Sequence, residues 1–538
     1  MPIIQIDNLG TPGIVTDTLP HELPVNAWSS GDNVRFRNNA VESTPGYDSV
    51  YGTLSIAPYW LMPWDDGSNY HWFYANAADI YSVTGTTHTS RSKSVGAYSA
   101  GAYPQWNGGV LGGVPVMNNT AFVDAPQSWD GSTKFQDLPN WPFNATPTPS
   151  SPKWHARVIR TFKNFLIALD MNENDGTTVT HFPTRVRWSN PADPGTVPGA
   201  WIPAATNLAG SVPLSATTDV LMDCLPLRDV NVVYKADTVH LMQFVGGTAV
   251  FAFRQAFGEF GLLSRRGVKS FFGKHLVLSK GDVIVHNGQS AQSVIDRKLR
   301  SNLFNSLAED NAANSFVVAN PDRKEMWVCI PESGSGTATC TKAYIWHWDD
   351  NTWTVVDLPS VAHIGLGFID RSGASNLIDD QNVIIDTVHT LIDGRVNNPA
   401  VLKLLMAQPG GPALFNADST NQFNGSNFTA YVERTGLAIR ASANGGTTTD
   451  TSSRKFVRRV YLKMDADPGV TVQVRVGAQQ YIDGPVTWTV AQDFDPSTQR
   501  YVDVRVQGVA VAIRVESTVN GQWQLSSYGL DLDVVGRA

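Results

Sequence analysis

Apolar and polar residues alternate along most of this chain in short runs, and turn-forming residues interrupt the runs roughly every 8 to 12 positions. Such a pattern is typical of short antiparallel β-strands. Near the amino end, Asn38-Asn39 separates Val34–Arg37 from Ala40–Ser43, and paired asparagines accept the positive φ angles of a type I′ turn. We therefore expect a β-hairpin there, and a sandwich, a barrel or a propeller for the rest of the chain.

One aromatic unit occurs twice in the chain. Residues 129–139 and residues 348–359 each contain Trp-Asp, a polar turn, a second aromatic residue and an Asp-Leu-Pro exit. A supersecondary unit that recurs at such a distance indicates repeated blades. About 375 residues of short strands, at roughly 40–50 residues per blade, predict a β-propeller of about seven or eight blades.

Only one segment has a strong helical period. Ile295, Leu299, Leu303 and Leu307 recur at every fourth position after Ser293, so a helix there would have one apolar face. The sequence predicts a single helix over residues 295–307, which either covers a sheet edge or serves as an interaction element.

The composition changes near residues 408–427, which are rich in turn-forming residues. After this segment apolar residues follow a two-residue period, most clearly in residues 470–476 and 501–506. We predict an all-β fold: a β-propeller of short antiparallel blades followed by a C-terminal β-sandwich, with one short inserted helix. The expected domains are an extended N-terminal arm and hairpin over residues 1–48, a propeller-like domain over residues 49–425 and the sandwich over residues 426–538.

Charged residues make up only 16% of the chain, against about 25% in an average globular protein. The formal net charge is −8, and no basic tail marks a nucleic-acid footprint, so the protein as a whole should repel DNA. The densest basic segment contains Arg454, Lys455, Arg458 and Arg459. We expect these four residues either on a solvated strand face or in a patch for a partner.

The sequence has no feature that predicts export or membrane insertion. Its first residues lack the basic start and apolar run of a secretory signal, and no window approaches about 18 uninterrupted apolar residues. We expect a soluble protein without a membrane-spanning segment, made in a cytoplasm. Cys224, Cys329 and Cys340 are few and odd in number, which favours buried thiols over a disulfide between Cys329 and Cys340.

Residues that could carry chemistry are sparse, and each has a structural interpretation. His286 follows Asp282 by four residues, so one strand face could present both to a metal ion, but a turn Asp and a strand-end His are favoured. Residues 128–135 partly match the Ser-x-Asp-x-Gly-x-Thr-Trp turn of sialidase-type propellers, with Ser132 in place of Gly and Lys134 in place of Thr. A hairpin turn is the favoured interpretation there.

The remaining candidates are weaker. Residues 273–275 and 333–336 lack the spacing of a phosphate-binding loop. Trp60, Trp64 and Trp72 could stack on sugars, although packing within blades is favoured. Acidic pairs could serve glycosidic acid–base chemistry, but all lie in predicted turns, where Asp caps its own backbone: Asp65-Asp66, Asp349-Asp350 and Asp379-Asp380. The sequence therefore predicts no catalytic, cofactor-binding or metal-binding residue, and no enzyme.

Several short segments stand out when they are taken in order along the chain. They are residues 31–37 (Gly-Asp-Asn-Val-Arg-Phe-Arg) with Val41-Glu42 and Pro45-Gly46-Tyr47, residues 156–168, residues 186–191, residues 258–261 with 267–269, and residues 286–288. Together they resemble the tail nozzle or hub proteins of short-tailed bacteriophages, the phage stabilisation family. The resemblance spans nearly the whole chain. No catalytic residue is carried over, because the family is not defined by one.

The resemblance implies a structural virion component without a cofactor. Its members form a homo-oligomeric ring, usually a hexamer, below the portal and the head-to-tail adaptor protein. The ring would extend the DNA-ejection channel and dock tail fibres, a spike or a plug. Genomic DNA would pass without sequence-specific binding. The implied location is the virion tail, assembled in the host cytoplasm.

Two other functions stay open at this point. The Asp-rich turns and the many tryptophans are compatible with a carbohydrate-binding or carbohydrate-processing propeller. A receptor-binding tail protein, whose terminal sandwich contacts the host, is the second alternative.

Overall fold

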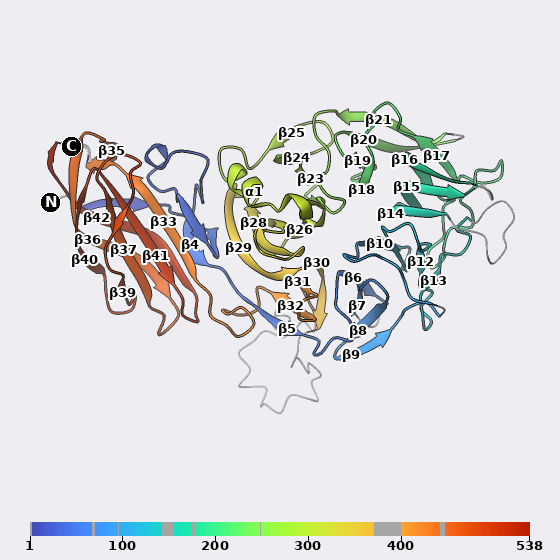
Figure 1. Ribbon diagram of the computed structural model, residues 1–538, viewed down its shortest axis with the longest axis horizontal. Coiled ribbons are helices and arrows are strands. Elements are labelled where there is room, and N and C mark those ends of the chain that lie inside the picture. Colours follow the sequence, from blue (N-terminus) through green and yellow to red (C-terminus); the bar gives the residue numbers. More distant parts are fainter. Residues whose placement is uncertain are drawn as a thin grey trace, which may run out of the picture. The chain divides into compact units, whose positions relative to one another are not determined.

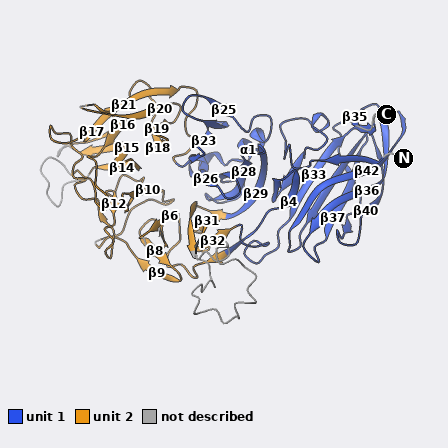
Figure 2. Ribbon diagram, turned by 180° about the vertical axis from the view of Figure 1, so that it is seen from behind, with its two compact units in different colours: residues 1–48, 266–359, 418–538 blue, residues 49–265, 360–417 orange. Residues whose placement is uncertain are grey.

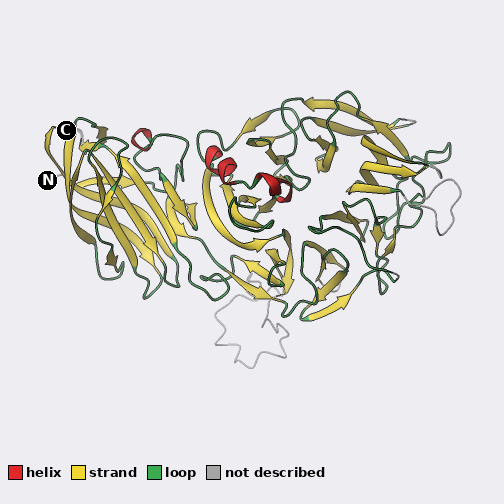
Figure 3. Cartoon of the chain, in the orientation of Figure 1, coloured by secondary structure: helices red, strands yellow, loops and turns green. Residues whose placement is uncertain are grey.

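The computed structural model describes residues 3–66, 70–94, 96–142, 154–174, 178–247, 249–370, 400–441 and 447–537. The chain is all-β: a β-propeller of short antiparallel blades is followed by a C-terminal β-sandwich, as the sequence predicts (Figure 1, Figure 3). The described residues contain one α-helix, α1 (Arg300–Ser306), and two 3-10 helices, η1 (Pro20–Glu22) and η2 (Glu309–Asn314).

Within the described residues, seven four-stranded sheets form the blades. In six of them the strands are consecutive in the chain, because short turns let each strand pair with the next; in the seventh, β30, β31 and β32 are joined by the N-terminal strand β5. The strands are β6 (Trp60–Asp65), β7 (Tyr70–Ala75), β8 (Ile80–Thr84) and β9 (Thr87–Ser90); β10 (Trp106–Leu111), β11 (Val114–Asn119), β12 (Gln127–Ser128) and β13 (Gln136–Asp137); β14 (His155–Phe162), β15 (Phe165–Asn174), β16 (Val179–Trp188) and β17 (Gly210–Pro213); β18 (Leu221–Leu227), β19 (Val230–Lys235), β20 (Val239–Gly246) and β21 (Val250–Phe257); β22 (Val268–Phe271), β23 (Lys274–Ser279), β24 (Asp282–His286) and β25 (Ala291–Ser293); β26 (Phe316–Asn320), β27 (Glu325–Ile330), β28 (Cys340–His347) and β29 (Thr352–Val361); and β30 (His363–Asp370), β31 (Ala400–Gln408), β32 (Ala413–Ala417) and β5 (Tyr47–Val50).

The sandwich recruits strands from both ends of the chain. One sheet has the order β3-β4-β42-β36-β40, with β1 also paired to β42, and the other has the order β2-β33-β41-β37-β38, with β39 also paired to β37. The N-terminal hairpin is the predicted one, since Asn38 and Asn39 have φ angles of 50° and 62°. The strands are β1 (Ile3–Asp7), β2 (Ser30–Asp32), β3 (Val34–Arg37), β4 (Ala40–Ser43), β33 (Ala430–Leu437), β36 (Ser453–Ala466), β37 (Val472–Gln479), β38 (Thr487–Trp488), β39 (Gln492–Phe494), β40 (Tyr501–Gly508), β41 (Ala510–Ser517) and β42 (Trp523–Arg537), and a separate pair is formed by β34 (Ile439–Ala441) and β35 (Thr447–Thr449).

The contacts within the chain divide it into two compact units (Figure 2). Unit 1 comprises residues 1–48, 266–359 and 418–538, and unit 2 comprises residues 49–265 and 360–417. The sandwich and the sheets β22–β25 and β26–β29 therefore belong to unit 1. The division into three domains, over residues 1–48, 49–425 and 426–538, stays a prediction.

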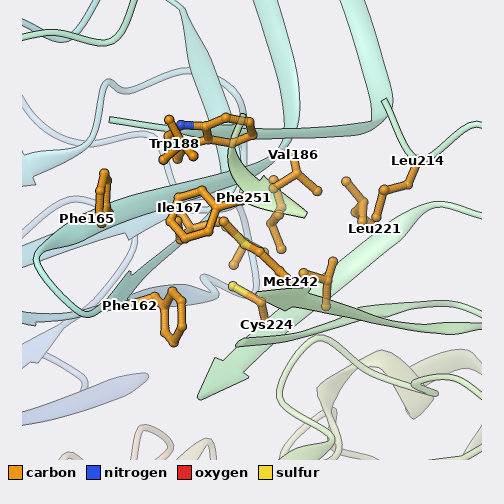
Figure 4. Packing of buried hydrophobic residues seen from close by; sticks show 14 residues of the cluster. Phe162, Phe165, Ile167, Val186, Trp188, Leu214, Leu221, Cys224, Met242 and Phe251 are labelled. Carbon is orange, nitrogen blue, oxygen red and sulfur yellow. The ribbon is translucent and has the colours of Figure 1, made fainter. Parts of the chain in front are cut away.

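Alternating apolar residues of neighbouring sheets build the core of unit 2. Figure 4 shows one such cluster, formed by side chains of β14–β17 with residues of β18–β21. Trp188 and Phe251 meet edge to face, with ring centroids 5.3 Å apart at 79°. Cys224 and Met242 lie in the same cluster, so this cysteine is a buried packing residue. Burial also raises the pKa of the Cys224 thiol to about 12, which keeps it protonated.

The two copies of the aromatic unit occupy equivalent places. Residues 129–139 run from the end of β12 through β13, and residues 348–359 run from the end of β28 into β29, so both link the third and fourth strands of a sheet. The second aromatic residue of each copy, Phe135 and Trp353, is buried, at 1% and 0% exposure. The repeat in the sequence therefore marks a repeat in the fold.

The helix in the structure is shorter than the segment of apolar periodicity that predicted it. Ile295, Leu299, Leu303 and Leu307 are all buried, so the apolar face was correctly assigned. However, α1 begins only at Arg300, because Arg297 has a φ angle of 58°, which an α-helix cannot contain.

Replacement of Trp353 by Ala should lower the free energy of unfolding by about 3–5 kcal/mol, as for other buried aromatic residues. The indole is fully buried, and its Nε1 donates to the carbonyl of Val294 at 2.8 Å. Trp348→Ala is the matched control, because Trp348 is only half-buried against Phe271. Urea and thermal unfolding followed by tryptophan fluorescence measure both variants, and equal losses would contradict the assigned burial.

Candidate functional site

The segment Gly31 to Arg37 makes a network of polar contacts with other segments of unit 1. We call this network the joint. Asn33, which is 2% exposed and has a φ angle of 56°, is at the first turn of the segment. Its Nδ2 donates to Asp357 Oδ2 at 2.8 Å and to the carbonyl of Thr429 at 3.0 Å, and its Oδ1 accepts from the backbone N–H of Asp357 at 2.8 Å. One asparagine thus ties β29 to the residue preceding β33 of the sandwich. Asparagine suits this place because it tolerates the left-handed conformation.

A lysine bridges two carboxylates beside Asn33. Lys342 Nζ on β28 is 2.6 Å from Asp32 Oδ2 and 2.6 Å from Asp357 Oδ1. Burial, and then the neighbouring Asp357, raise the pKa of Asp32 to about 6. Burial works against the charge of Lys342, but the two carboxylates raise its pKa above the ordinary value. Two acids that share one cation cannot both be fully compensated, so Asp32 holds a proton more readily than a free Asp.

Two residues farther along the same segment, Arg35 is buried between two acids. Its guanidinium contacts Glu325 Oε2 on β27 and donates from Nη2 to Asp418 Oδ1 at 3.2 Å. The three side chains are only 3%, 6% and 7% exposed. Nε donates to Thr44 Oγ1 at 3.0 Å, and the guanidinium lies 5.0 Å from the Trp327 ring centroid. Burial alone would lower the pKa of Arg35, but Glu325 and Asp418 raise it, so the charge is retained.

Asp418 extends the network to the turn that precedes β27. Its Oδ2 lies 3.1 Å from Arg323 Nε and 3.1 Å from Asn320 Nδ2. Arg323 Nη1 is also 3.4 Å from Glu42 Oε1 on β4. Asp418 follows β32 directly and has a φ angle of 56°, so the chain turns at this residue towards the sandwich strands.

A close backbone crossing completes the joint. A Cβ atom added to Gly46 would lie 1.9 Å from the carbonyl oxygen of Gln422, so only glycine fits there. Next to it, Tyr47 stacks on Phe423 with centroids 4.9 Å apart, and Phe423 stacks on Phe428 at 4.0 Å. Residues 45–47 are thereby held against the segment that leads into the sandwich.

A polar hollow of about 470 Å³ opens beside the joint. Arg37, Glu42, Arg323, Asp465 and Asp467 are among its lining residues. Within the residues that the structure describes, no group of three or more His, Cys, Asp or Glu side chains is placed to hold a metal ion. The charges of the joint are engaged with one another, and their arrangement holds strands together.

The metal candidate from the sequence separates into two structural roles. Asp282 Oδ1 accepts from Ser293 Oγ at 2.7 Å and from the backbone N–H of Val283. His286 is buried against the ring of His275, with centroids 5.5 Å apart. Burial, and then His275, lower the pKa of His286 to about 3. Asp282 is therefore a turn residue and His286 a neutral core residue.

The sialidase-like segment is a hairpin turn. Asp130 Oδ1 accepts the backbone N–H of Ser132 at 2.9 Å, and Trp129 Nε1 donates to the Ser132 carbonyl at 3.2 Å. Arg91 lies over the Trp129 ring at 4.9 Å. The hydrogen bonds from Ser132 lower the pKa of Asp130, as expected for a capping carboxylate.

The other candidates also lie in turns or in the core. Residues 273–275 lie at the β22–β23 turn, and residues 333–336 follow β27 at a hairpin tip. Asp66 pairs with His71 at 2.8 Å. Asp350 lies 3.2 Å from His347, whereas Asp379-Asp380 lies outside the described residues. Trp60 and Trp72 are 6% and 0% exposed, and half-buried Trp64 packs against Phe73 and Trp129, so all three serve in packing within the blades.

The basic run of β36 is not one surface patch. Lys455 is fully buried, and its Nζ donates to the carbonyls of Ser453 and Val509 at 2.8 and 2.9 Å. Arg458 pairs with Asp533, and Arg459 Nε pairs with Asp503 at 2.7 Å. The expectation of four cations on one face is therefore wrong for Lys455, because the strand alternation points its side chain inwards.

The cysteines and the helices add two simple findings. Cys224, Cys329 and Cys340 are free and buried. No helix in the described ranges is both long enough and apolar enough to cross a bilayer.

No family model and no curated protein matches this chain. Similar solved structures include the AfRom2 CNH domain (10% identity, 70% of this chain and 98% of that chain, TM-score 0.34) and the Pan2 WD40 domain of Neurospora crassa (9% identity, 70% and 95%, TM-score 0.34). YCF48 bound to D1 peptide is a third (10% identity, 70% and 99%, TM-score 0.31). Function does not follow from such distant likenesses, and the fold assignment rests on the strand order described above.

The sequence did not reveal the charges that make the joint. Val34-Arg35-Phe36-Arg37 alternates like a half-exposed strand, which places both arginines in solvent. Only Arg37 is exposed, because long-range partners cover both faces of β3 at Arg35. Lys342, Glu325 and Asp418 were missed for the same reason. The one available signal was that residues 31–37 head the series of segments with a family resemblance.

Replacement of Arg35 by Met should destabilise unit 1 by about 3–5 kcal/mol, because Glu325 and Asp418 would stay buried without their cation. Arg37→Met on the same strand is the matched control, since Arg37 is exposed. Thermal unfolding at neutral pH measures the difference. Equal melting temperatures for the two variants would show that the buried network contributes nothing.

Asp32 should add a characteristic pH dependence to stability. Its folded pKa of about 6 lies above the ordinary value of 3.8, so between these pH values the folded state binds a proton that the unfolded state has released. Stability therefore falls as pH rises from about 4 to 6, by about 1 kcal/mol per pH unit from this group. Chemical unfolding of wild type and Asp32→Asn over this range isolates the effect. Parallel pH profiles would contradict it.

Proposed function

We propose that this chain is a structural subunit of the tail nozzle or hub of a short-tailed bacteriophage. In this proposal it forms a homo-oligomeric, hexameric ring below the portal and adaptor, extends the DNA-ejection channel and docks fibres, a spike or a plug. The observation that carries the proposal is the buried joint. Asp32, Asn33 and Arg35 of the joint come from the first segment of the family resemblance, and their polar contacts hold strands together.

The other segments of the resemblance also have architectural roles. Residues 156–168 form the hairpin of β14 and β15, which supplies both core clusters of that sheet. In residues 258–261, a Cβ on Gly261 would lie 2.3 Å from the carbonyl oxygen of Lys235. In residues 286–288, the Gly288 N–H donates to His286 Nδ1 at 3.2 Å. Residues under such packing constraints are what a family of structural proteins would share, which supports the proposal.

The charge of the chain is compatible with a conduit. A net charge of −8 gives no general attraction for a polyanion, and strong phosphate pairing would slow DNA in transit. A low proportion of charged residues also suits extensive contacts between subunits, since protein interfaces are depleted of charge at their centres.

The decisive experiment is assembly with the adaptor. Mass photometry and negative-stain microscopy of the full chain, alone and with the adaptor protein, should show a ring-forming species, hexameric when complete. Arg37→Met should assemble like the wild type. A strictly monomeric chain that never joins the adaptor would refute the proposal.

A glycan array with hydrolysis assays tests the alternative of a carbohydrate-binding or carbohydrate-processing propeller. If the chain neither binds nor hydrolyses any glycan, this alternative is refuted.

The receptor-binding alternative needs point variants of the sandwich. Because β1, β3 and β4 share a sheet with β42, and β2 pairs with β33, deletion of the terminal residues would leave N-terminal strands without partners. Tyr481 and Val490 are 63% and 86% exposed, so Tyr481→Ser and Val490→Ser change the surface and leave the core intact. Loss of host-cell binding with normal particle assembly would favour adhesion. Unchanged cell binding and assembly would favour a scaffold.

A further inference from the structure

A second charged cluster lies in unit 2, around Asp170 on β15. Asp170 is 2% exposed and has a φ angle of 54° at a bulge between Leu169 and Met171. Its Oδ2 lies 3.2 Å from Arg157 Nε and 3.2 Å from Arg265 Nη2, and its Oδ1 lies 2.5 Å from His181 Nε2. One buried carboxylate therefore organises three nitrogen-bearing side chains. Bulges of this kind are over-represented next to functional sites, where they re-aim a side chain.

The cluster has more positive than negative charge. Arg160 is next to it and binds Asp223 through two contacts of 2.7 Å. Arg157, Arg160 and Arg265 thus face the two carboxylates Asp170 and Asp223, which leaves an excess of one positive charge on these five side chains. Burial, and then repulsion from Arg157, lower the pKa of Arg265, although Asp170 and Asp223 act to raise it.

The side chains of the cluster are partly exposed to solvent, and contacts with Phe122 and Thr120 fix their positions. Arg157 and His181 are 35% and 47% exposed, and Arg265 is 19% exposed. The Arg157 guanidinium lies 4.2 Å from the Phe122 ring centroid, and the His181 ring is 5.4 Å from the same ring. Arg157 Nη1 also donates to the Thr120 carbonyl at 3.2 Å. The side chains are therefore fixed before any ligand arrives, which lowers the entropy cost of binding.

We propose that Arg157, Arg265 and His181 form an oxyanion-binding site, which takes the carboxylate or phosphate group of a small acidic ligand. Planar guanidinium groups present paired donors that match these groups, and the buried Asp170 aligns the three side chains without neutralising them fully. The proposal does not rest on the ring assembly proposed above, because it is argued only from contacts within one blade and the segment before β22.

Calorimetric titration of the full chain tests the site with inorganic phosphate and, separately, with the carboxylated sugar N-acetylneuraminic acid. Heat with phosphate alone assigns a phosphate ligand, and heat with the sugar acid assigns a carboxylate. Arg157→Gln and Arg265→Gln should each weaken binding about tenfold or more, since a charge-assisted hydrogen bond contributes that much. Arg185→Gln is the matched control on the same sheet, because Arg185 pairs with Glu173 at 2.7 Å. It should bind as the wild type does.

Arg157→Lys is a second variant, chosen in case the Gln variants lose binding only because they fail to fold. It keeps the positive charge beside Asp170 but loses the planar fork, so it should retain the melting temperature and still bind several-fold more weakly. The proposal is overturned if neither probe binds the wild type. It is equally overturned if folded Arg157→Lys and Arg265→Gln bind as tightly as Arg185→Gln.

Discussion

The burial of the Arg35 guanidinium between Glu325 and Asp418 is the constraint on which unit 1 depends. The three groups come from β3, from β27 and from the residue after β32, which are far apart in the chain. Each buried ion costs several kcal/mol in lost hydration, and only an accurate geometry with further hydrogen bonds offsets that cost. Thr44 and Trp327 supply such bonds. The network is therefore favourable only when all three stretches are in register, which makes their assembly cooperative.

Asn33, in the turn between β2 and β3, applies a similar constraint two residues before Arg35. It binds Asp357 and the Thr429 carbonyl, whereas Arg35 binds Glu325 on β27 and Asp418, which follows β32. Apolar residues of similar size would bury comparable area, but they would tolerate a slipped strand. Directional contacts at Asn33 and Arg35 disfavour a shift in strand register, because a shift by one residue would leave the buried charges without their partners. This is the role in which buried polar groups are best attested.

Local patterns predicted the fold because they are themselves local. The Asn38-Asn39 turn, the strand alternation and the repeated aromatic unit depend on neighbouring residues, and the structure contains all three. The start of α1 was misplaced because a single left-handed residue, Arg297, interrupts an apolar period that stays buried throughout. The charged joint and the Asp170 cluster could not be predicted. Their partners are distant in sequence, and an alternating strand gives no sign that both of its faces are covered.

Several cations are buried on backbone carbonyls, which changes the meaning of the composition. Lys455 and Lys235 are fully buried and donate to carbonyl oxygens, as does Arg434, whose pKa burial lowers to about 10. Carbonyls satisfy these donors without adding negative charge, although Lys235 also pairs with Asp219 at 2.9 Å. Because such residues count towards the 16% of charged residues yet lie inside, the surface carries fewer cations than the sequence suggests. A surface that is polar through Ser, Thr, Asn and Gln loses less hydration energy when copies of a chain associate, because neutral groups are cheaper to desolvate than ions.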